Sequence, residues 1–354
     1  MEPRDLAAYD YALPADRIAQ EPTPERDGAR LLVLERASGA LHHDAISGLA
    51  AHLRPGDLVV RNATRVVPAR LRGRKASGGA VEALLLGPAP GAHAWRALVR
   101  GSGRLRPGAK LRFEGAGAVR DAEVAALASG GELVLAFAAG EDPYAAGETP
   151  LPPYIRREAP RGADAERYQT IFARVPGSVA APTAGLHLSE RVLAALAAHG
   201  VASAEVVLHV GPGTFRPLRD EDLRRGRLHA EPYELPEATA GAIAATRARG
   251  GCVVAIGTTV ARVLETCADR AGGLRAGADE TRLFLLPGAP FRVVDALLTN
   301  FHLPRSTLLM LVSAFAGRER ILRLYRAAIA EGYRFYSYGD AMLLLGKGAA
   351  DLSR

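Results

Sequence analysis

Residues 204–215 read AEVVLHVGPGTF, and they decide how the rest of the chain is interpreted. The apolar run Ala204–Leu208 predicts a short buried strand, and a glycine-rich loop starts at His209. Ligands of open α/β sheets lie beyond the carboxyl ends of strands, where glycine lets the backbone approach them closely. Two interpretations stay open: a ligand-binding loop, or a tight turn with a hydrogen-bonded structural histidine. A dinucleotide fingerprint is not present, because its third glycine would fall at Arg216.

Composition indicates a globular protein of two or three domains. The chain has 354 residues, of which 48% are hydrophobic and 23% charged. Cys252 and Cys267 have no His or Cys neighbours at metal spacing, so we expect neither a zinc site nor a disulfide framework, as in a reducing cytoplasm. The amino terminus lacks the apolar core of a signal peptide, and the apolar run near Leu308–Ala316 is too short to span a bilayer. We therefore expect a cytoplasmic protein without a membrane segment.

Positive charge is concentrated in one part of the sequence. Between Arg61 and Arg120 there are 13 Lys and Arg residues but only two acidic ones, whereas the rest of the chain has 32 basic and 36 acidic residues. Such a concentration favours a polyanion partner. A bias toward arginine in the genome explains why there is little lysine, but it does not explain the shortage of acids in this window. We therefore predict contact with nucleic acid.

The same window has the pattern of a small antiparallel β-barrel. Short β-like runs alternate with turns that contain Gly or Pro, which is typical of a barrel. The predicted strands are Ala69–Arg72, Val81–Leu86, Trp95–Val99, Lys110–Phe113, Ala122–Leu127 and Glu132–Ala138. We place a basic barrel at residues 66–140 and expect it to face RNA, although a structural barrel with an ordinary solvated surface stays an alternative.

The flanking residues, 1–65 and 141–354, alternate strands and helices. This pattern predicts an α/β domain with a mixed or parallel sheet, into which the barrel is inserted. Ser189 is a candidate N-cap for one of the helices. The predicted strands are Arg30–Glu35, Leu58–Arg61, Ala204–Leu208, Cys252–Ile256, Arg282–Leu286, Val293–Leu298 and Arg334–Tyr338. The predicted helices are His43–Leu53, Glu190–His199, Glu237–Arg249, Val260–Cys267, Thr307–Ala316 and Arg318–Glu331.

Several polar loops follow the predicted strands. They are His209–Phe215, Gly257–Thr259, Asn300–Ser306 and Gly339–Asp340. Gly257–Thr259 opens a helix directly after a strand, an arrangement that binds anions or ribose but also serves as an ordinary helix cap. We expect these loops to line one pocket.

The loops also carry a family resemblance, which extends from Tyr11 to Leu345. The segments 62–70 (NATRVVPAR), 180–187 (AAPTAGLH), 209–217 (HVGPGTFRP), 257–259 (GTT), 299–317 (TNFHLPRSTLLMLVSAFAG) and 336–342 (YSYGDAM) resemble the S-adenosylmethionine:tRNA ribosyltransferase-isomerases of queuosine biosynthesis. The resemblance implies an α/β domain with an inserted barrel, in agreement with the pattern above. It also implies transfer and isomerisation of the ribosyl group of S-adenosylmethionine onto 7-aminomethyl-7-deazaguanine at the tRNA wobble position. The products are epoxyqueuosine, adenine and methionine.

In this reaction S-adenosylmethionine is consumed as a substrate, and neither a cofactor nor a metal is implied. The tRNA substrates would carry a GUN anticodon, and the protein would be a monomer or a homodimer. The family reaction starts with removal of a proton from C5′, next to the sulfonium, and this step needs a positioned base. Histidine suits that task near neutral pH, and carboxylates or aromatic faces suit the sulfonium. The catalytic candidates are His187, His209, His229, Glu231, His302 and Asp340.

Other polar residues of the motifs are candidates for binding. For S-adenosylmethionine they are Thr183, Gly211, Gly213, Thr214, Phe215, Gly257, Thr258, Thr259, Arg262, Asn300 and Ser306. For tRNA they are Asn62, Arg65, Arg70, Arg72, Arg74, Lys75 and Arg305, in the barrel, at its junction or at the pocket. Without the resemblance, a plain RNA-binding module and a dinucleotide-dependent oxidoreductase would remain. The number of polar loops argues against the first, and the incomplete glycine fingerprint argues against the second.

Overall fold

The strands of the α/β domain distribute their apolar side chains between two separate cores. In β3 (Leu58–Asn62), Leu58 and Val60 pack with helices on one face of the sheet, and Val59 packs with those on the other. This alternation is what a strand covered on both faces requires. The structure is a computed structural model that describes residues 5–103, 105–159, 161–211, 213, 223 and 226–346.

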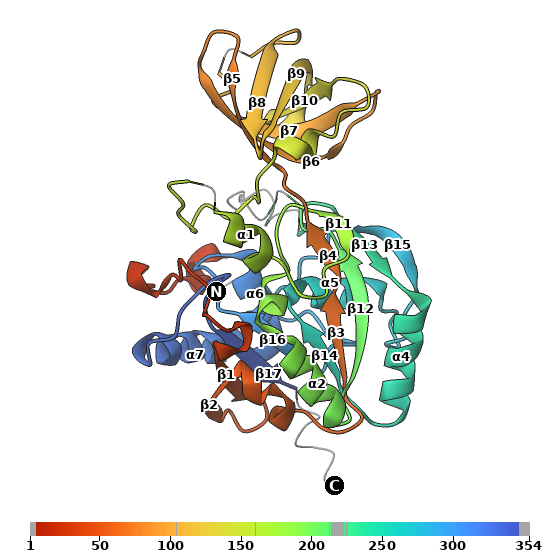
Figure 1. Ribbon diagram of the computed structural model, residues 1–354. Coiled ribbons are helices and arrows are strands. Elements are labelled where there is room, and N and C mark those ends of the chain that lie inside the picture. Colours follow the sequence, from red (N-terminus) through yellow and green to blue (C-terminus); the bar gives the residue numbers. More distant parts are fainter. Residues whose placement is uncertain are drawn as a thin grey trace.

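Within these residues the large sheet has nine strands, in the order β15-β13-β12-β3-β14-β16-β17-β1-β2 (Figure 1). Besides β3, they are β1 (Arg30–Glu35), β2 (Leu41–Ala45), β12 (Ala202–Leu208), β13 (Glu231–Leu235), β14 (Val253–Ile256), β15 (Gly277–Thr281), β16 (Ala296–Asn300) and β17 (Ala341–Leu345). The neighbours β12, β3, β14 and β16 are parallel, and β17 is antiparallel to β16. The carboxyl ends of these four strands and the amino end of β17 therefore share one edge, which we call the loop edge.

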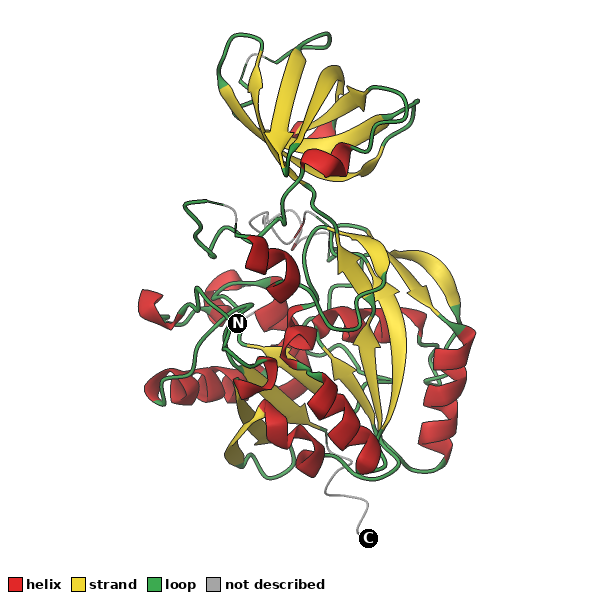
Figure 2. Ribbon diagram, in the orientation of Figure 1, coloured by secondary structure: helices red, strands yellow, loops and turns green. Residues whose placement is uncertain are grey.

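Helices cover both faces of this sheet (Figure 2). On one face lie α4 (Glu237–Ala248), α5 (Thr258–Cys267), α6 (Thr307–Ala316) and α7 (Arg318–Ala330). On the other lie α2 (Glu190–Ala198) and the 3-10 helices η4 (Ile46–His52) and η7 (Thr183–His187). The remaining short helices are η1 (Leu6–Tyr9), η2 (Ala15–Arg17), η3 (Arg26–Gly28), η5 (Ser129–Gly131), η6 (Pro143–Ala146) and α1 (Gly162–Arg167). Ser189 caps α2 as predicted, since its hydroxyl accepts the Val192 N–H. None of the helices in the described ranges has the length and apolar character needed to cross a bilayer.

The barrel is closed and antiparallel, with its strands in the order β10-β7-β6-β5-β8-β9. Its strands are β5 (Arg70–Lys75), β6 (Ala80–Pro88), β7 (Ala94–Arg100), β8 (Lys110–Gly115), β9 (Ala118–Leu127) and β10 (Glu132–Phe137). All six match the predicted runs to within a few residues. The barrel has its own core, to which Ala146 of η6 also contributes. The predicted fold class, a mixed α/β domain with an inserted antiparallel barrel, is confirmed.

Two segments connect the barrel to the α/β domain, and they pair with each other. The short strand β4 (Thr64–Val66) leads into the barrel. After the barrel, the chain passes through η6 and α1 and then forms β11 (Val175–Ser178), which is parallel to β4. The side chain of Gln169 binds both main-chain groups of Val66, at 3.0 and 3.1 Å. We call β4 and β11 together the barrel junction.

Four predicted elements of the α/β domain need correction. Residues 282–286 form no strand; Phe284 and Leu285 pack into the core from a loop. Residues 334–338 also form no strand, because Tyr336 has a φ of 72° and β17 begins only at Ala341. The predicted helix 43–53 begins on strand β2 and continues as the 3-10 helix η4, and the predicted strand 293–298 begins only at Ala296. Buried apolar runs look alike in sequence whether or not they pair in a sheet.

Asn62, the last residue of β3, holds the sheet together where the chain turns toward the barrel. Its Nδ2 donates to the Leu208 carbonyl and its Oδ1 accepts the Leu208 N–H, both at 3.0 Å. The same Oδ1 accepts the N–H of Thr64 at 3.1 Å. The side-chain amide thus replaces the main-chain partner that β12 loses when β3 leaves the sheet. Asn62 is 1% exposed, so the geometry gives no support to the predicted contact between Asn62 and tRNA.

Replacing Asn62 by leucine should destabilise the protein by about 3 kcal/mol or more. The substitution leaves both main-chain groups of Leu208 and the Thr64 N–H unpaired, and each such group costs about 1–3 kcal/mol. Urea unfolding followed by circular dichroism measures the effect. Replacing the exposed Arg249 by alanine is the control and should change stability by less than about 0.5 kcal/mol. An equally small change for Asn62→Leu would contradict the bracing role.

Candidate active site at the loop edge

The main chain after β12 is fixed on both sides. The His209 N–H donates to the Pro232 carbonyl at 3.0 Å. The Val210 N–H donates to the hydroxyl of Ser178, at the end of β11, also at 3.0 Å. The Gly211 N–H donates to Glu231 Oε1 at 2.9 Å. The first three residues of the loop therefore keep one backbone conformation, which presents the His209 side chain at the loop edge.

His209 is half-buried, and its Nδ1 lies 2.7 Å from the Thr64 hydroxyl. Burial lowers the pKa of His209 below its usual value. The imidazole is therefore neutral near pH 7, as a general base must be.

Glu231 and Arg262 form a buried ion pair beneath this loop. The Arg262 Nε donates to the Leu283 carbonyl at 3.1 Å. The second terminal nitrogen of Arg262 is buried and has no partner among the described residues. Both Glu231 oxygens are occupied, by Gly211 and by Arg262, so this carboxylate supports the loop.

The outer part of the loop is only partly described. A Cβ atom at Gly213 would lie 2.7 Å from the ring of His229, so that exposed imidazole packs directly on the glycine. The predicted substrate residues Thr214 and Phe215 lie outside the described residues.

The start of α5 is tied to the neighbouring strand ends. Gly257 has a φ of 96°, which favours glycine, and its N–H donates to the Leu298 carbonyl of β16 at 2.8 Å. Thr258 is buried, and the Thr259 hydroxyl accepts a bond of 3.3 Å from Asn62 Nδ2. The prediction that this turn lies beside the other polar loops therefore matches the geometry.

Asn300, at the end of β16, joins two other predicted residues in a buried network. Its Oδ1 accepts from the Thr183 hydroxyl at 2.8 Å, and its Nδ2 donates to the Tyr336 carbonyl at 3.1 Å. These two partners fix the orientation of the amide, so Nδ2 is also a donor to His187 Nε2, 2.9 Å away. A neutral His187 then carries its proton on Nδ1. Burial, with the nearby charge of Arg334, lowers the pKa of His187 to about 4.

His302 is buried close to the same edge but serves the core. Its Nε2 lies 3.0 Å from the Thr299 hydroxyl. Its main-chain N–H donates to the Tyr325 hydroxyl at 2.9 Å. Burial lowers the pKa of His302 to about 3.

Ser306 and Arg305 have structural partners. Ser306 caps α6 by accepting the Leu309 N–H at 3.2 Å, and Arg305 pairs with Asp10 at the surface.

Asp340 does not have the geometry of a catalytic carboxylate. It is 2% exposed, and its two oxygens accept the N–H groups of Arg30, at 2.9 Å, and Arg334, at 2.7 Å. This carboxylate ties the start of β1, at Arg30, to the loop that begins at Arg334, so the catalytic role of Asp340 stays a prediction that this geometry does not support.

Tyr336 was not selected from the sequence, although it lies in one of the motif segments. It combines a positive φ with a ring centroid 4.4 Å from that of Tyr154. Its hydroxyl is buried without a partner among the described residues. Unusual backbone angles of this kind cluster at functional sites.

Apart from Arg305, the predicted cationic residues for tRNA lie along the barrel junction and the barrel. Arg65, Arg72 and Arg74 are exposed, and Arg72 pairs with Glu148 at 2.6 Å. Arg70 donates to the Leu151 carbonyl at 2.6 Å, and Lys75 donates to the Gly103 carbonyl at 3.1 Å.

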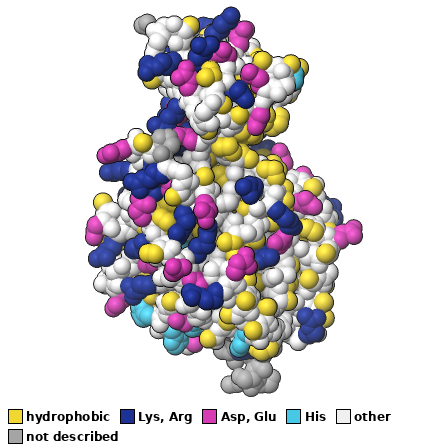
Figure 3. Space-filling view, in the orientation of Figure 1, with side chains coloured by type: hydrophobic (Ala, Val, Ile, Leu, Met, Phe, Trp, Pro, Cys, Tyr) yellow, Lys and Arg dark blue, Asp and Glu magenta, His cyan; other side chains and the backbone are white. Residues whose placement is uncertain are grey.

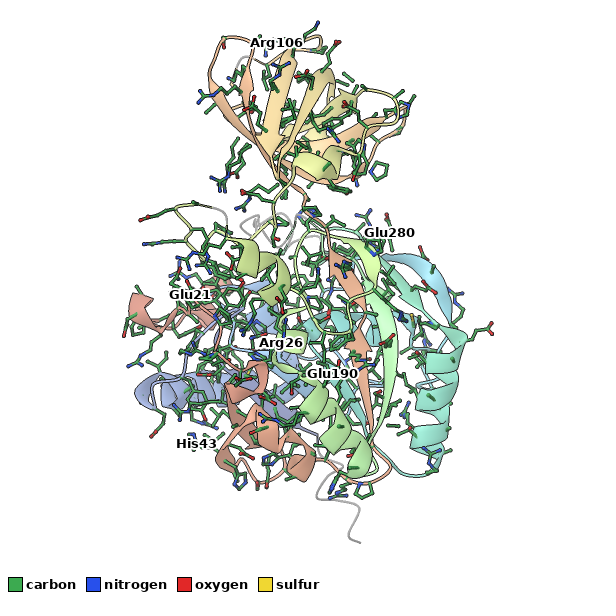
Figure 4. The ribbon with its side chains drawn as sticks, in the orientation of Figure 1. Glu21, Arg26, His43, Arg106, Glu190 and Glu280 are labelled. Atoms are coloured by element: carbon green, nitrogen blue, oxygen red, sulfur yellow. The ribbon has the colours of Figure 1, made fainter. Side chains whose placement is uncertain are left out.

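The outer face of the barrel carries a groove of about 640 Å³. Its charged lining residues are Arg74, Lys75, Lys110, Arg112, Asp121 and Glu123. Figure 3 shows basic side chains on the barrel and on the α/β surface below it, with acidic ones interspersed. In Figure 4, Arg106 lies at the end of the barrel that points away from the α/β domain.

In the described part of the chain, no group of three or more His, Cys, Asp or Glu side chains is arranged to hold a metal ion.

Fold and site together define an α/β protein with an inserted barrel, in which polar segments after β12, β14 and β16 meet at one sheet edge. The chain belongs to the queuosine biosynthesis protein family, which it matches over residues 6–344. This confirms the family resemblance carried by the sequence motifs.

Individual relatives match the chain along nearly its whole length. It is 54% identical over 349 residues to an S-adenosylmethionine:tRNA ribosyltransferase-isomerase of Anaeromyxobacter dehalogenans, covering 96% of this chain and 99% of the relative. It is also 54% identical to the protein of that name from Gloeobacter violaceus, with 97% and 96% covered. The crystal structure of an S-adenosylmethionine tRNA ribosyltransferase from Thermotoga maritima is similar, with 36% identity, a TM-score of 0.56, and 96% of this chain and 100% of that chain covered.

The depressed pKa values of His187 and His302 predict a loss of stability on acidification. Unfolded histidine binds a proton below a pKa of about 6.5. The folded protein accepts that proton only near pH 4 at His187 and near pH 3 at His302. Between pH 6.5 and 4 the unfolded state therefore binds more protons, and the free energy of unfolding falls by up to about 1.4 kcal/mol per pH unit for each histidine.

Urea unfolding of the wild type and of His302→Gln at pH 7, 6 and 5 measures this effect. At pH 5 the variant should have lost about 2 kcal/mol less than the wild type, relative to pH 7. Equal losses in the two proteins would show that folded His302 takes up a proton in this range.

Proposed function

We propose that this chain transfers and isomerises the ribosyl group of S-adenosylmethionine onto 7-aminomethyl-7-deazaguanine at the wobble position of tRNA. The products are epoxyqueuosine in the RNA, adenine and methionine. The observation that carries the proposal is the convergence of three polar strand-end segments at one edge. This convergence occurs in a chain that matches relatives named S-adenosylmethionine:tRNA ribosyltransferase-isomerase along almost their full length.

The chemistry of the proposed reaction starts at C5′, which the adjacent sulfonium makes acidic. A neutral base must take that proton, and among the motif histidines His209 suits the task best. It is half-buried, whereas His187 and His302 are buried within hydrogen-bond networks and His229 is exposed. We assign the base to His209.

Adenine must then leave the ribose, and a donor near its ring nitrogens assists departure. His187 carries its remaining proton on Nδ1 because Asn300 occupies Nε2. We assign this donor role to His187, and the positioning of its ring to Asn300 and Thr183. Attack of the neutral amine of the modified base and loss of methionine complete the transfer. S-adenosylmethionine supplies all the carbon atoms transferred, so the proposal requires no cofactor.

The RNA partner is a tRNA with a GUN anticodon, and its backbone binds to the barrel. Exposed Arg72 and Arg74 and the basic groove beside them suit phosphate contacts, which depend on charge and not on sequence.

A direct assay tests the function. The protein is incubated with S-adenosylmethionine and an anticodon stem-loop that carries the aminomethyl base. Chromatography should detect free adenine, and mass spectrometry should detect a matching gain in RNA mass. The control stem-loop carries unmodified guanine, which lacks the attacking amine and should gain no mass. If folded protein releases no adenine with the modified stem-loop, the proposed function is wrong.

Charge reversal on the barrel tests the RNA surface. The double variant Arg72→Glu/Arg74→Glu should bind tRNA at least about tenfold more weakly near 0.1 M salt. The slope of log affinity against log salt should become less steep by about two, because binding without two phosphate contacts releases about two fewer counterions. Filter binding or fluorescence anisotropy across a salt series measures both quantities.

The matched control, Arg54→Glu/Arg249→Glu, changes the net charge equally. It places both reversals by the amino ends of β3 and β14, at the sheet edge opposite the loop edge. Its affinity should fall much less than that of the barrel variant. Equal losses would indicate a general effect of net charge and would refute the barrel surface.

A further inference from the structure

The ring of His209 is held by two residues of the barrel junction. On one side, the hydroxyl of Thr64 lies 2.7 Å from Nδ1, and Thr64 is fully buried on β4. On the other side, the ring lies against the backbone of Gly177 on β11. A Cβ atom at position 177 would lie 2.9 to 3.0 Å from Cε1, Nδ1 and Nε2 of the imidazole.

Gly177 also has a backbone conformation that other residues rarely adopt. Its φ is 144°, and the register between β11 and β4 shifts next to it. The glycine thus provides a flat surface for the ring, which a side chain at this position would displace. With the main chain of His209 and Val210 already bonded to Pro232 and Ser178, only the ring orientation remains to be set.

We propose that Thr64 and Gly177 are positioning residues that hold the His209 imidazole in a single orientation and tautomer. Nδ1–H donates to the Thr64 hydroxyl, and Nε2 presents its lone pair at the loop edge. This inference rests on the proposed function for the identity of the proton that Nε2 removes. In that step the C5′ proton moves to Nε2, and the electron pair of the C–H bond stays on C5′ beside the sulfonium. The imidazolium so formed keeps its bond from Nδ1–H to Thr64.

Among the residues that the structure describes, few charged groups lie near this ring. On β13, Glu231 is paired with Arg262 and with the Gly211 N–H. On β4, the neighbouring Arg65 is exposed and alternates to the other side of the strand. The Thr64 hydroxyl is therefore the polar group that Nδ1 contacts, and with this hydroxyl as acceptor Nδ1 carries the proton of the neutral imidazole and Nε2 is unprotonated.

The test compares Thr64→Val, which removes the hydroxyl at nearly constant volume, with Thr64→Ser, which keeps it. In the first measurement, the free full-length protein with 15N-labelled histidine is studied by NMR above pH 7. The wild type and Thr64→Ser should show His209 with a protonated Nδ1 and an unprotonated Nε2, and Thr64→Val should show a mixture of tautomers. A wild-type His209 protonated on Nε2, or an unchanged tautomer in Thr64→Val, would overturn the proposal.

The second measurement uses adenine release. Thr64→Val should lower kcat by about tenfold or more while KM for S-adenosylmethionine changes less than about twofold, and Thr64→Ser should recover most of the loss. A kcat of Thr64→Val equal to the wild type, at equal thermal stability, would also overturn the proposal. Gly177→Ala should lower kcat in the same way by displacing the ring, and a wild-type kcat for it would remove Gly177 from the assignment.

The two measurements separate this inference from the proposed function. The NMR measurement needs no substrate, so it decides the tautomer even if the protein releases no adenine. Absence of adenine release by the wild type would refute the function, and a wrong tautomer in an active wild type would refute only the positioning.

Discussion

The paired hydrogen bonds between the Asn62 side chain and Leu208 are the constraint on which the rest of the structure depends. A strand that leaves a sheet abandons the main-chain groups of its neighbour, and buried groups of that kind must find other partners. Here the amide of Asn62 has the same donor and acceptor as a peptide unit, and it supplies both to Leu208. As a result the chain can leave the sheet after β3 while both main-chain groups of Leu208, at the end of β12, stay bonded. The inserted domain and the candidate site thus share one solution to a hydrogen-bonding problem.

Other buried polar side chains of the motifs also serve the main chain. Glu231 accepts the Gly211 N–H, and Asn300 donates to the Tyr336 carbonyl. Asp340 accepts the N–H of Arg30, at the start of β1, and that of Arg334, in a loop. Burying such groups without partners would be costly, and each of them has partners that belong to a loop. The loop edge is therefore a frame of fixed loops. Within it, the half-buried His209 is the histidine best placed for chemistry.

The sequence predicted the barrel well and the role of individual polar residues poorly. Strand period and turn residues are local properties, and they located all six barrel strands. Whether a carboxylate or an amide contacts a ligand depends on which main-chain groups come close in the fold, and no local pattern records that. For this reason no sequence pattern indicated that Asn62 and Asp340 bond main-chain groups of the fold. The segment 334–338 was misassigned because its buried aromatic residues resemble a strand, whereas the chain turns at Tyr336 and its pairing is limited to one bridge between Phe335 and Ile18. The tautomer of His187 likewise follows only from the three-dimensional partners of Asn300.

The path from the barrel to His209 is short and tightly bonded. Where the chain enters and leaves the barrel, Arg70 and Glu148 exchange two main-chain hydrogen bonds of 3.2 and 2.9 Å. Six residues before Arg70 lies Thr64, which contacts His209, and Val66 between them is held by the side chain of Gln169. The paired main-chain bonds and the Gln169 side chain leave this connection little freedom. The entry of the chain into the barrel and the orientation of the His209 ring thus depend on the same few residues, which join the proposed RNA surface to the proposed active site.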